Sequence, residues 1–223
     1  MLSMLVIATT NENKLKEFKE ILGGLDIEIL SLSDFGPIPP VIEDGDSFDE
    51  NAYKKALHTA KVLGLPAIAD DSGLVVDALG GAPGIYSARY AGEDATDEKN
   101  RKKLLDSLKT EKNRAAHFQC VISIATPGGP ALTYEASCDG EIIDEEKGDN
   151  GFGYDPIFFF PELGKTFAQM ESYEKHQVSH RGKALAEVKA ELPMIKKWLE
   201  QRILEQKPEK PDHDDFKDND WSK

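Results

Sequence analysis

Apolar residues along this chain fall into short runs, which predict buried strands, and into two longer segments of alternating polarity. The runs predict strands at 5–8, 27–30, 67–69, 74–76 and 155–160. The alternating segments, 115–126 and 131–138, flank a Pro-Gly-Gly-Pro sequence, so we expect a hairpin-like pair. The four residues Asp70-Asp71-Ser72-Gly73, between two of the short strands, are predicted to form a tight turn.

Apolar residues spaced three or four apart predict helices in other parts of the chain. These helices are expected at 15–22, 47–64, 96–109 and 182–204. Ser47 and Glu50 have the spacing of a capping box, in which two side chains bond backbone amides at the start of a helix. Pro193 lies inside the last helix and should kink or restart it, because proline has no amide hydrogen to donate.

Length and charge limit the possible functions. A chain of 223 residues suits one large domain or two closely joined lobes. Its net charge of -14 argues against a nucleic acid or an anionic membrane as a partner bound by charge. Acidic residues outnumber basic ones in 205–223, where few residues are apolar. We therefore expect a single domain at 1–204 followed by an acidic, solvated tail.

The sequence predicts neither secretion nor membrane insertion. The apolar stretch at 1–9 is too short to span a bilayer and no basic region precedes it, so we expect a cytoplasmic protein. Cys120 and Cys138 are too few for a disulfide scaffold and lack the spacing of metal ligands. We expect both cysteines to be buried on strands.

The first candidate for ligand binding is a polar segment directly after the first predicted strand. A strand that leads through a polar turn into a helix presents free amide groups and, here, a lysine, which together suit an anion. The same residues also suit an ordinary helix cap, and their spacing is not that of a P-loop. The segment consists of Thr9, Thr10, Asn11, Glu12, Asn13 and Lys14.

Two acidic pairs, Glu43-Asp44 and Asp70-Asp71, are candidates for cation binding. Carboxylates suit Mg2+, which takes oxygen ligands, and adjacent aspartates raise one another's pKa, so that one can act as a base. The alternative is a turn held by side-chain hydrogen bonds, which is the better explanation for Asp44. It explains Asp70 and Asp71 poorly, because two acids between apolar strands are costly to bury without a cation.

The fourth cluster combines aromatic and cationic residues. Phe152 and Tyr154, in a glycine-rich segment, offer ring faces on which a base can stack. Lys175, His180 and Arg181 concentrate positive charge just before the last predicted helix, where cations oppose the helix macrodipole and are expected to face a ligand. Together the clusters indicate a metal-dependent enzyme that acts on a phosphorylated aromatic ligand.

These motifs, in this order, closely resemble those of the inosine/xanthosine triphosphate pyrophosphatase family, the house-cleaning nucleotide hydrolases. Each motif alone is weak, but the ordered set is specific and extends over about residues 5–199. The matching stretches are 9–14 (TTNENK), 48–52 (FDENA), 69–74 (ADDSGL), 80–90 (GGAPGIYSARY), 151–156 (GFGYDP) and 179–182 (SHRG).

The resemblance implies Mg2+-dependent hydrolysis of purine nucleoside triphosphates, preferably ITP, dITP and XTP, to the nucleoside monophosphate and pyrophosphate. Such an enzyme removes deaminated purines from the nucleotide pool. The resemblance also implies an elongated α/β fold of two lobes around a central mixed sheet, with the site in the cleft between the lobes, and a homodimer. The alternatives are a Maf-like pyrophosphatase with another base preference and a nucleotide-binding regulator without catalytic activity.

The resemblance further implies a role for each matching residue. The segment 9–14 would bind the triphosphate, and Ser72 would contact the substrate. Glu43 and Asp71 would hold Mg2+, and Asp71 would also accept a proton from the attacking water. The base pocket would consist of Phe152, Gly153, Tyr154, Asp155, Lys175, His180 and Arg181.

Two positions depart from the family's pattern. Thr10 stands where glycine is usual, which affects how closely the backbone can approach a phosphate. The segment 42–45 reads Ile-Glu-Asp-Gly in place of Glu-Glu-Thr-Gly, so Glu43 is assigned to the metal by alignment to the glycine. Lys175 and Arg181 carry only donors, so they suit a 6-oxo group on the purine and not the 6-amino group of adenine.

Overall fold

Among residues 4–205, which the computed structural model describes, seven strands form one mixed sheet in the order β2-β1-β3-β4-β5-β6-β7. β1 is parallel to β2 and β3, and the remaining neighbours are antiparallel. The expected α/β fold with a central mixed sheet is confirmed. The strands are β1 (Met4–Ile7), β2 (Glu28–Ser31), β3 (Ala67–Val76), β4 (Ala115–Ala125), β5 (Ala131–Ile142), β6 (Phe158–Phe160) and β7 (Lys165–Thr166).

The predicted turn at Asp70–Gly73 is wrong, because β3 runs unbroken through these residues. It pairs with β4 along its whole length, from Ala67 opposite Ala125 to Val76 opposite Ala116. Aspartate, serine and glycine favour turns in isolation. Here the pairing with β4, together with cations supplied by other elements, overrides that local preference.

Five helices surround the sheet within the described part of the chain. The capping of α1 and α2 follows from the sequence. Asn11 caps α1 with its side chain, and Ser47 accepts a hydrogen bond from the Glu50 amide, but Glu50 bonds the amide of Asp46 and not that of Ser47. The helices are α1 (Glu12–Leu22), α2 (Phe48–Leu63), α3 (Asp97–Ser107), α4 (Ser172–Val178) and α5 (His180–Glu205).

The last helix begins earlier than predicted, and of the two outcomes expected at Pro193 a restart does not occur. It begins at His180, so His180 and Arg181 lie in its first turn and not before it. It also continues through Pro193 without restarting. Buried apolar residues on both sides of the proline, Leu192 and Ile195, belong to the core against the sheet, and this packing keeps the segment helical. The predicted tail at 205–223 lies outside the described residues, apart from Glu205.

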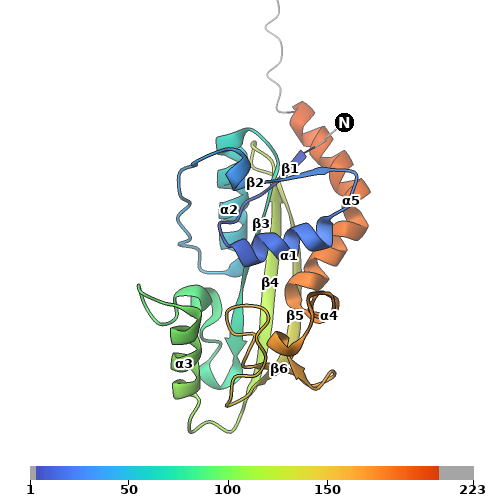
Figure 1. Cartoon of the computed structure of the whole chain (residues 1–223). Helices are drawn as coiled ribbons and strands as arrows, with labels where there is room; N and C mark the ends of the chain where they lie inside the picture. Colours follow the sequence, from blue (N-terminus) through green and yellow to red (C-terminus); the bar gives the residue numbers. More distant parts are fainter. Residues whose placement is uncertain (1–3, 206–223) are drawn as a thin grey trace, which may run out of the picture.

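Alternation along the strands divides the core between the two faces of the sheet. Ile7 and Ile68 pack with α1 and α5, whereas Ala67 and Ala69 pack with Ala56 and Ala60 of α2. Figure 1 shows this arrangement, with α1 and α5 on one side of the sheet and α2 on the other. The long strands β3 to β5 extend to the end of the molecule that carries α3 and β6, which gives the fold its elongated shape.

A few further expectations can be compared with the structure. Cys120 and Cys138 are free, buried and located on β4 and β5, as predicted. The strand expected at 155–160 is shorter, because Asp155 lies in a turn before β6. Within residues 4–205, we find no helix that is long and apolar enough to cross a membrane.

Candidate active site

One cavity of about 480 Å3 collects most of the sequence-predicted site residues. Its lining comes from the end of β1 and the start of α1, from β3, from α2 and the segment before it, from α3, from the loop between β5 and β6, and from α4 and the start of α5. Glu12 and Asn13 are not part of its lining. The predicted residues that line it are Thr9, Thr10, Asn11, Lys14, Glu43, Asp71, Ser72, Phe152, Gly153, Tyr154, Asp155, Lys175, His180 and Arg181.

The start of α1 is both a helix cap and a source of positive charge. The Asn11 side chain accepts hydrogen bonds from the amides of Asn13 and Lys14, so these two amides already have partners. Thr9 accepts a hydrogen bond from the Asn11 amide in the same turn. The Lys14 ammonium lies 3.0 Å from Asp70 at the edge of the cavity. The lysine, more than the capped amides, is therefore suited to an anion.

Asp70 and Asp71 point to opposite faces of the sheet, because successive side chains of a strand alternate. Asp70 faces α1 and α5 and contacts Lys14 and Arg181. Asp71 faces α2 and contacts Lys55, with 2.8 Å between the Lys55 ammonium and the carboxylate. The two adjacent acids therefore belong to different clusters and do not form one cation site.

Lys55, which sequence reasoning missed, joins two of the predicted residues. Its ammonium lies 2.9 Å from Glu43 and 2.8 Å from Asp71. Lys55 is one helical turn after Asn51, which is buried, so the spacing places it on the inward face of α2. That spacing is the signal in the sequence that could have identified it. Asp44, by contrast, pairs with Lys54 on the surface and does not line the cavity, as expected.

The carboxylates of Glu43 and Asp71 fit a divalent cation. Both lie within 3 Å of one point of positive charge, the Lys55 ammonium. Among the described residues, no group of three or more His, Cys, Asp or Glu side chains could enclose a metal. Two carboxylates are nevertheless sufficient for Mg2+, which usually keeps several waters and completes its shell with substrate phosphates.

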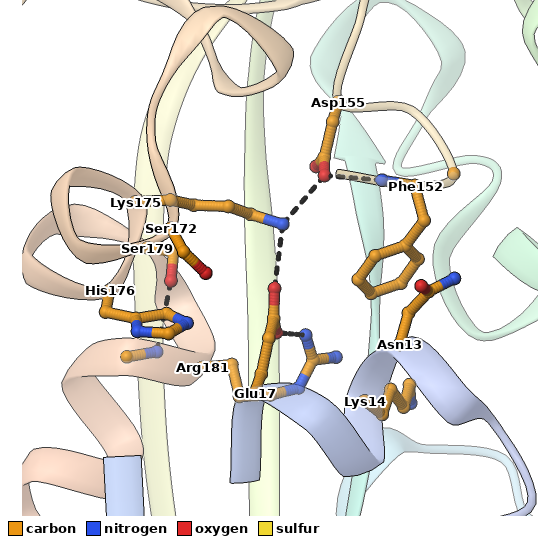
Figure 2. A network of polar contacts seen from close by, with 12 residues as sticks. Asn13, Lys14, Glu17, Phe152, Asp155, Ser172, Lys175, His176, Ser179 and Arg181 are labelled. Carbon is orange, nitrogen blue, oxygen red and sulfur yellow. Dashed lines mark hydrogen bonds and ion pairs between the residues drawn. The ribbon is translucent and has the colours of Figure 1, made fainter. Parts of the chain in front are cut away.

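A buried ionic network lies next to the cavity and contains a second residue that the sequence did not reveal, Glu17. Figure 2 shows Lys175 of α4 pointing between Asp155 and Glu17 of α1, with ammonium-to-oxygen distances of 2.7 and 2.9 Å. Arg181 of α5 contacts the other oxygen of Glu17 and also bonds Asp70 at 2.9 Å. Glu17 thus links two of the three predicted cations, Lys175 and Arg181.

The network sets the charge of each acid. Burial alone would raise the pKa of Glu17, but Arg181 and Lys175 lower it to about 2. Burial also opposes the charge on Asp70, yet Lys14 and Arg181 hold its pKa well below the usual range. Burial raises the pKa of Asp71, although the Lys55 ammonium lowers it in part. Two adjacent aspartates thus have pKa values shifted in opposite directions, the pattern that separates a structural acid from a potential base.

His180 does not contribute the positive charge that the sequence suggested. Burial and the neighbouring Arg181 lower the pKa of His180 well below its ordinary value, so its ring is neutral at physiological pH. The ring stacks on Phe118 of β4, with centroids 4.7 Å apart and an interplanar angle of 11°. His180 therefore offers an apolar surface and a neutral nitrogen to the cavity.

The two aromatic residues of the predicted base pocket, Phe152 and Tyr154, differ in burial and in their contacts. Tyr154 is buried, and its hydroxyl donates a hydrogen bond to the Ser87 carbonyl at 2.9 Å. Phe152 is only half-buried, and the Lys175 ammonium lies 4.8 Å from its ring centroid. Phe152 is thus the ring that is better placed to stack against a ligand.

Comparison with known proteins agrees with this geometry. A sequence model of the Ham1 family matches residues 5–191. A dITP/XTP pyrophosphatase of Desulfotalea psychrophila is 67% identical over 223 residues, which are 100% of each chain. One of Syntrophobacter fumaroxidans is 58% identical over 92% of this chain and 88% of its own length.

Solved structures give the same result for the fold. A HAM1 protein from Coxiella burnetii superimposes with a TM-score of 0.80 at 43% identity, covering 87% of this chain and 100% of its own. The Ham1 protein of Staphylococcus aureus gives a TM-score of 0.78 at 46% identity, covering 86% and 98%. The matched residues include those that line the cavity from β1 to the start of α5, and the chain therefore belongs to the Ham1 family.

Proposed function

We propose that this protein hydrolyses non-standard purine nucleoside triphosphates, namely dITP, ITP and XTP, to the nucleoside monophosphate and pyrophosphate. The observation that carries the proposal is one cavity whose lining combines two kinds of groups. We call the part lined by Lys14, Lys55 and the Glu43–Asp71 pair the phosphate end, and the part lined by Phe152 and Lys175 the base end. The first end suits phosphates and a cation, and the second suits a base. The relatives named above as dITP/XTP pyrophosphatases support the same reading.

In the proposed reaction, a water molecule attacks the α-phosphorus while the bond to the bridging oxygen breaks and pyrophosphate leaves. Asp71 accepts the proton of the water; burial raises the pKa of this carboxyl, and the Lys55 ammonium opposes the rise. Lys14 and Lys55 offset the negative charge that develops on the phosphate oxygens. When Mg2+ is bound by Glu43 and Asp71, it supplies further positive charge at these oxygens.

The base end recognises the purine through donors. The Lys175 ammonium has three hydrogens and two carboxylate partners, so one donor is left for a ligand. Most donors of Arg181 are already engaged by Asp70, Glu17 and Ser72. Lys175 is therefore the better candidate for the 6-oxo group. An adenine would place its amino group against a donor and leave both unpaired, which costs about 1–3 kcal/mol.

The proposal also includes expectations from the resemblance and from composition. These are a homodimer, which the resemblance implies, and, from composition and charge, a cytoplasmic location, one domain at 1–204 with an acidic tail after it, and no nucleic acid or membrane partner. Light scattering after gel filtration measures the first of these directly.

The decisive experiment is a pyrophosphate-release assay with dITP, ITP, XTP, GTP and ATP in the presence of Mg2+, repeated with EDTA. We expect turnover of the first three, weak turnover of ATP and loss of activity with EDTA. A Maf-like enzyme would prefer other bases, and a binding regulator would release no pyrophosphate at all. Turnover of ATP equal to that of dITP would contradict the donor argument.

A further inference from the structure

Two side chains of α3 hold the backbone of a single residue, Gly153, in the loop between β5 and β6. The Gly153 amide donates to Asp97 at 2.7 Å, and the Gly153 carbonyl accepts from Arg101 at 2.9 Å. Asp97 and Arg101 are four residues apart and therefore share one face of the helix. Gly153 has a φ of +61°, a backbone conformation that glycine adopts without strain. The arrangement thus clamps both polar groups of this residue.

Hydrogen bonds also attach α3, the helix that carries Asp97 and Arg101, to its neighbours. The buried Asn100 donates to the Ala88 carbonyl and accepts from the Ala91 amide, which attaches α3 to the preceding 3-10 helix (Gly84–Arg89). In that short helix, the Ser87 hydroxyl accepts a hydrogen bond from Leu74 of β3. Hydrogen bonds therefore connect the clamp, through α3 and the short helix, to β3, the strand that carries Asp71.

The Phe152 backbone has two supports, namely the Asp155 carboxylate, which accepts from the Phe152 amide at 2.9 Å, and the clamp on the next residue, Gly153. Tyr154 has its own bond to Ser87, and Asp155 is held by Lys175. The Phe152 side chain is half-buried and reaches toward Lys175 and Arg181, whose charged groups lie 4.8 and 5.8 Å from its ring centroid. Figure 2 shows the ring standing beside the cations at the base end. The residue next to it, Gly153, is the point at which α3 can fix its position.

We infer that Asp97 and Arg101 are positioning residues that clamp the backbone amide and carbonyl of Gly153 and thereby hold Phe152 in place for the base of the nucleotide. This inference rests on the proposed function and deepens it. The side-chain hydrogen bonds and ion pairs of Asp97 and Arg101 go to Gly153 and Glu146, and none goes to Lys14, Lys55, Glu43 or Asp71. We therefore expect the clamp to act on binding of the base and not on the chemical step. Such a loss of uniform binding raises KM and leaves kcat nearly unchanged.

The test uses variants of the full chain and dITP as substrate. Asp97→Ala should raise KM about 5- to 20-fold with kcat within about twofold, because it removes a hydrogen bond to a charged group. Asp97→Asn keeps a side-chain oxygen that can accept from Gly153, so it should restore KM to within about threefold of the wild type. Glu98→Ala is the matched control, since Glu98 lies exposed in the same first turn of α3.

Variants of Arg101 provide a second, independent test. Arg101→Ala should raise KM as Asp97→Ala does, whereas Lys102→Ala, at an exposed position of the same helix, should change neither constant. Equal falls in kcat for the Asp97 and Arg101 variants, or unchanged KM in both, would overturn the inference.

Hydrogen–deuterium exchange tests in the absence of substrate whether Asp97 and Arg101 hold the loop. Peptides that cover 151–155 should exchange faster in Asp97→Ala and Arg101→Ala than in the wild type, and Glu98→Ala should match the wild type. Unchanged exchange in both clamp variants would refute the inference. Absence of pyrophosphate release by the wild-type chain would instead refute the proposed function, so the two failures are distinguishable.

Discussion

At the scale of single residues, the site depends on the alternation of side chains along β3. Asp70 is committed to Lys14 and Arg181, and the pKa of Asp70 is held low. Asp71, on the opposite face, has a raised pKa and one close cation, Lys55. Of the two adjacent acids, Asp71 is therefore the one that can gain a proton during a reaction.

Asp71→Asn should abolish pyrophosphate release while the protein stays folded. An amide has nearly the same shape as the carboxylate but cannot serve as the base. Circular dichroism and initial rates with dITP measure the two effects, and Asp44→Asn, an exposed acid outside the cavity, is the control. A folded Asp71→Asn variant with near-wild-type turnover would contradict the assigned role.

Lys55→Gln should move the acidic limb of the pH profile to higher pH. The Lys55 charge lowers the pKa of Asp71, against the effect of burial, so its removal raises that pKa further. The base form of Asp71 exists only above its pKa, so activity is then lost at a higher pH as the solution is acidified. The measurement is kcat/KM for dITP against pH, with Lys54→Gln as the control. An unchanged acidic limb would show that Asp71 does not set it.

At the scale of elements, Glu17 connects three helices, two of which are far from the first in the sequence. It lies on α1 and contacts Lys175 of α4 and Arg181 of α5. The sequence predicted the longer helices from their apolar spacing, but not α4, whose seven residues are too few to show that periodicity. Glu17 could not be recognised because its partners are more than 150 residues away, and only the fold makes them neighbours.

Glu17→Gln should lower the free energy of unfolding by about 3–5 kcal/mol at pH 7, because it leaves buried cations without their partner. The folded-state pKa of Glu17 is lowered from 4.5 to about 2, so the stabilisation is fully present above pH 4.5 and is lost as the pH falls toward 2. The difference between variant and wild type should therefore shrink over this window. Urea unfolding at several pH values measures it.

The exposed Glu28 of β2 provides the control for this prediction, as Glu28→Gln should leave the stability within about 0.5 kcal/mol of the wild type. A Glu17→Gln variant as stable as Glu28→Gln at pH 7 would show that the network does not stabilise the fold.

At the scale of the whole molecule, the sequence was sufficient to locate the longer helices and every described strand except β7, and most of the site residues that it predicted do line the cavity. It failed where segments distant in the sequence determine the local backbone conformation or the charge of a side chain. β3 passes through a turn-forming sequence because β4 pairs with it throughout, and His180 is neutral because the fold buries it beside Arg181. Composition also gave a net charge of -14 but not where the charge lies.

Mutations should separate the effect of the net charge on KM from the effect of the charges in the cavity. Lys14 and Lys55 line the cavity, whereas many acids are exposed and distant from it. In physiological salt, screening over roughly 8 Å confines an exposed charge to its own neighbourhood. A variant with Glu28, Glu111, Glu141 and Glu162 all changed to glutamine should therefore keep KM for dITP within about twofold of the wild type, although it loses four negative charges.

Lys14→Gln removes one positive charge at the phosphate end, and it should raise KM at least about tenfold, because charge-assisted hydrogen bonds to phosphate are about twice as strong as neutral ones. Steady-state kinetics of both variants at about 50 and 300 mM salt, between which the Debye length falls roughly 2.5-fold, provides the measurement. Equal effects from the quadruple variant and Lys14→Gln would mean that the bulk charge, and not the local arrangement, controls binding. A larger effect of Lys14→Gln, persisting at the higher salt, is what a partly buried contact requires.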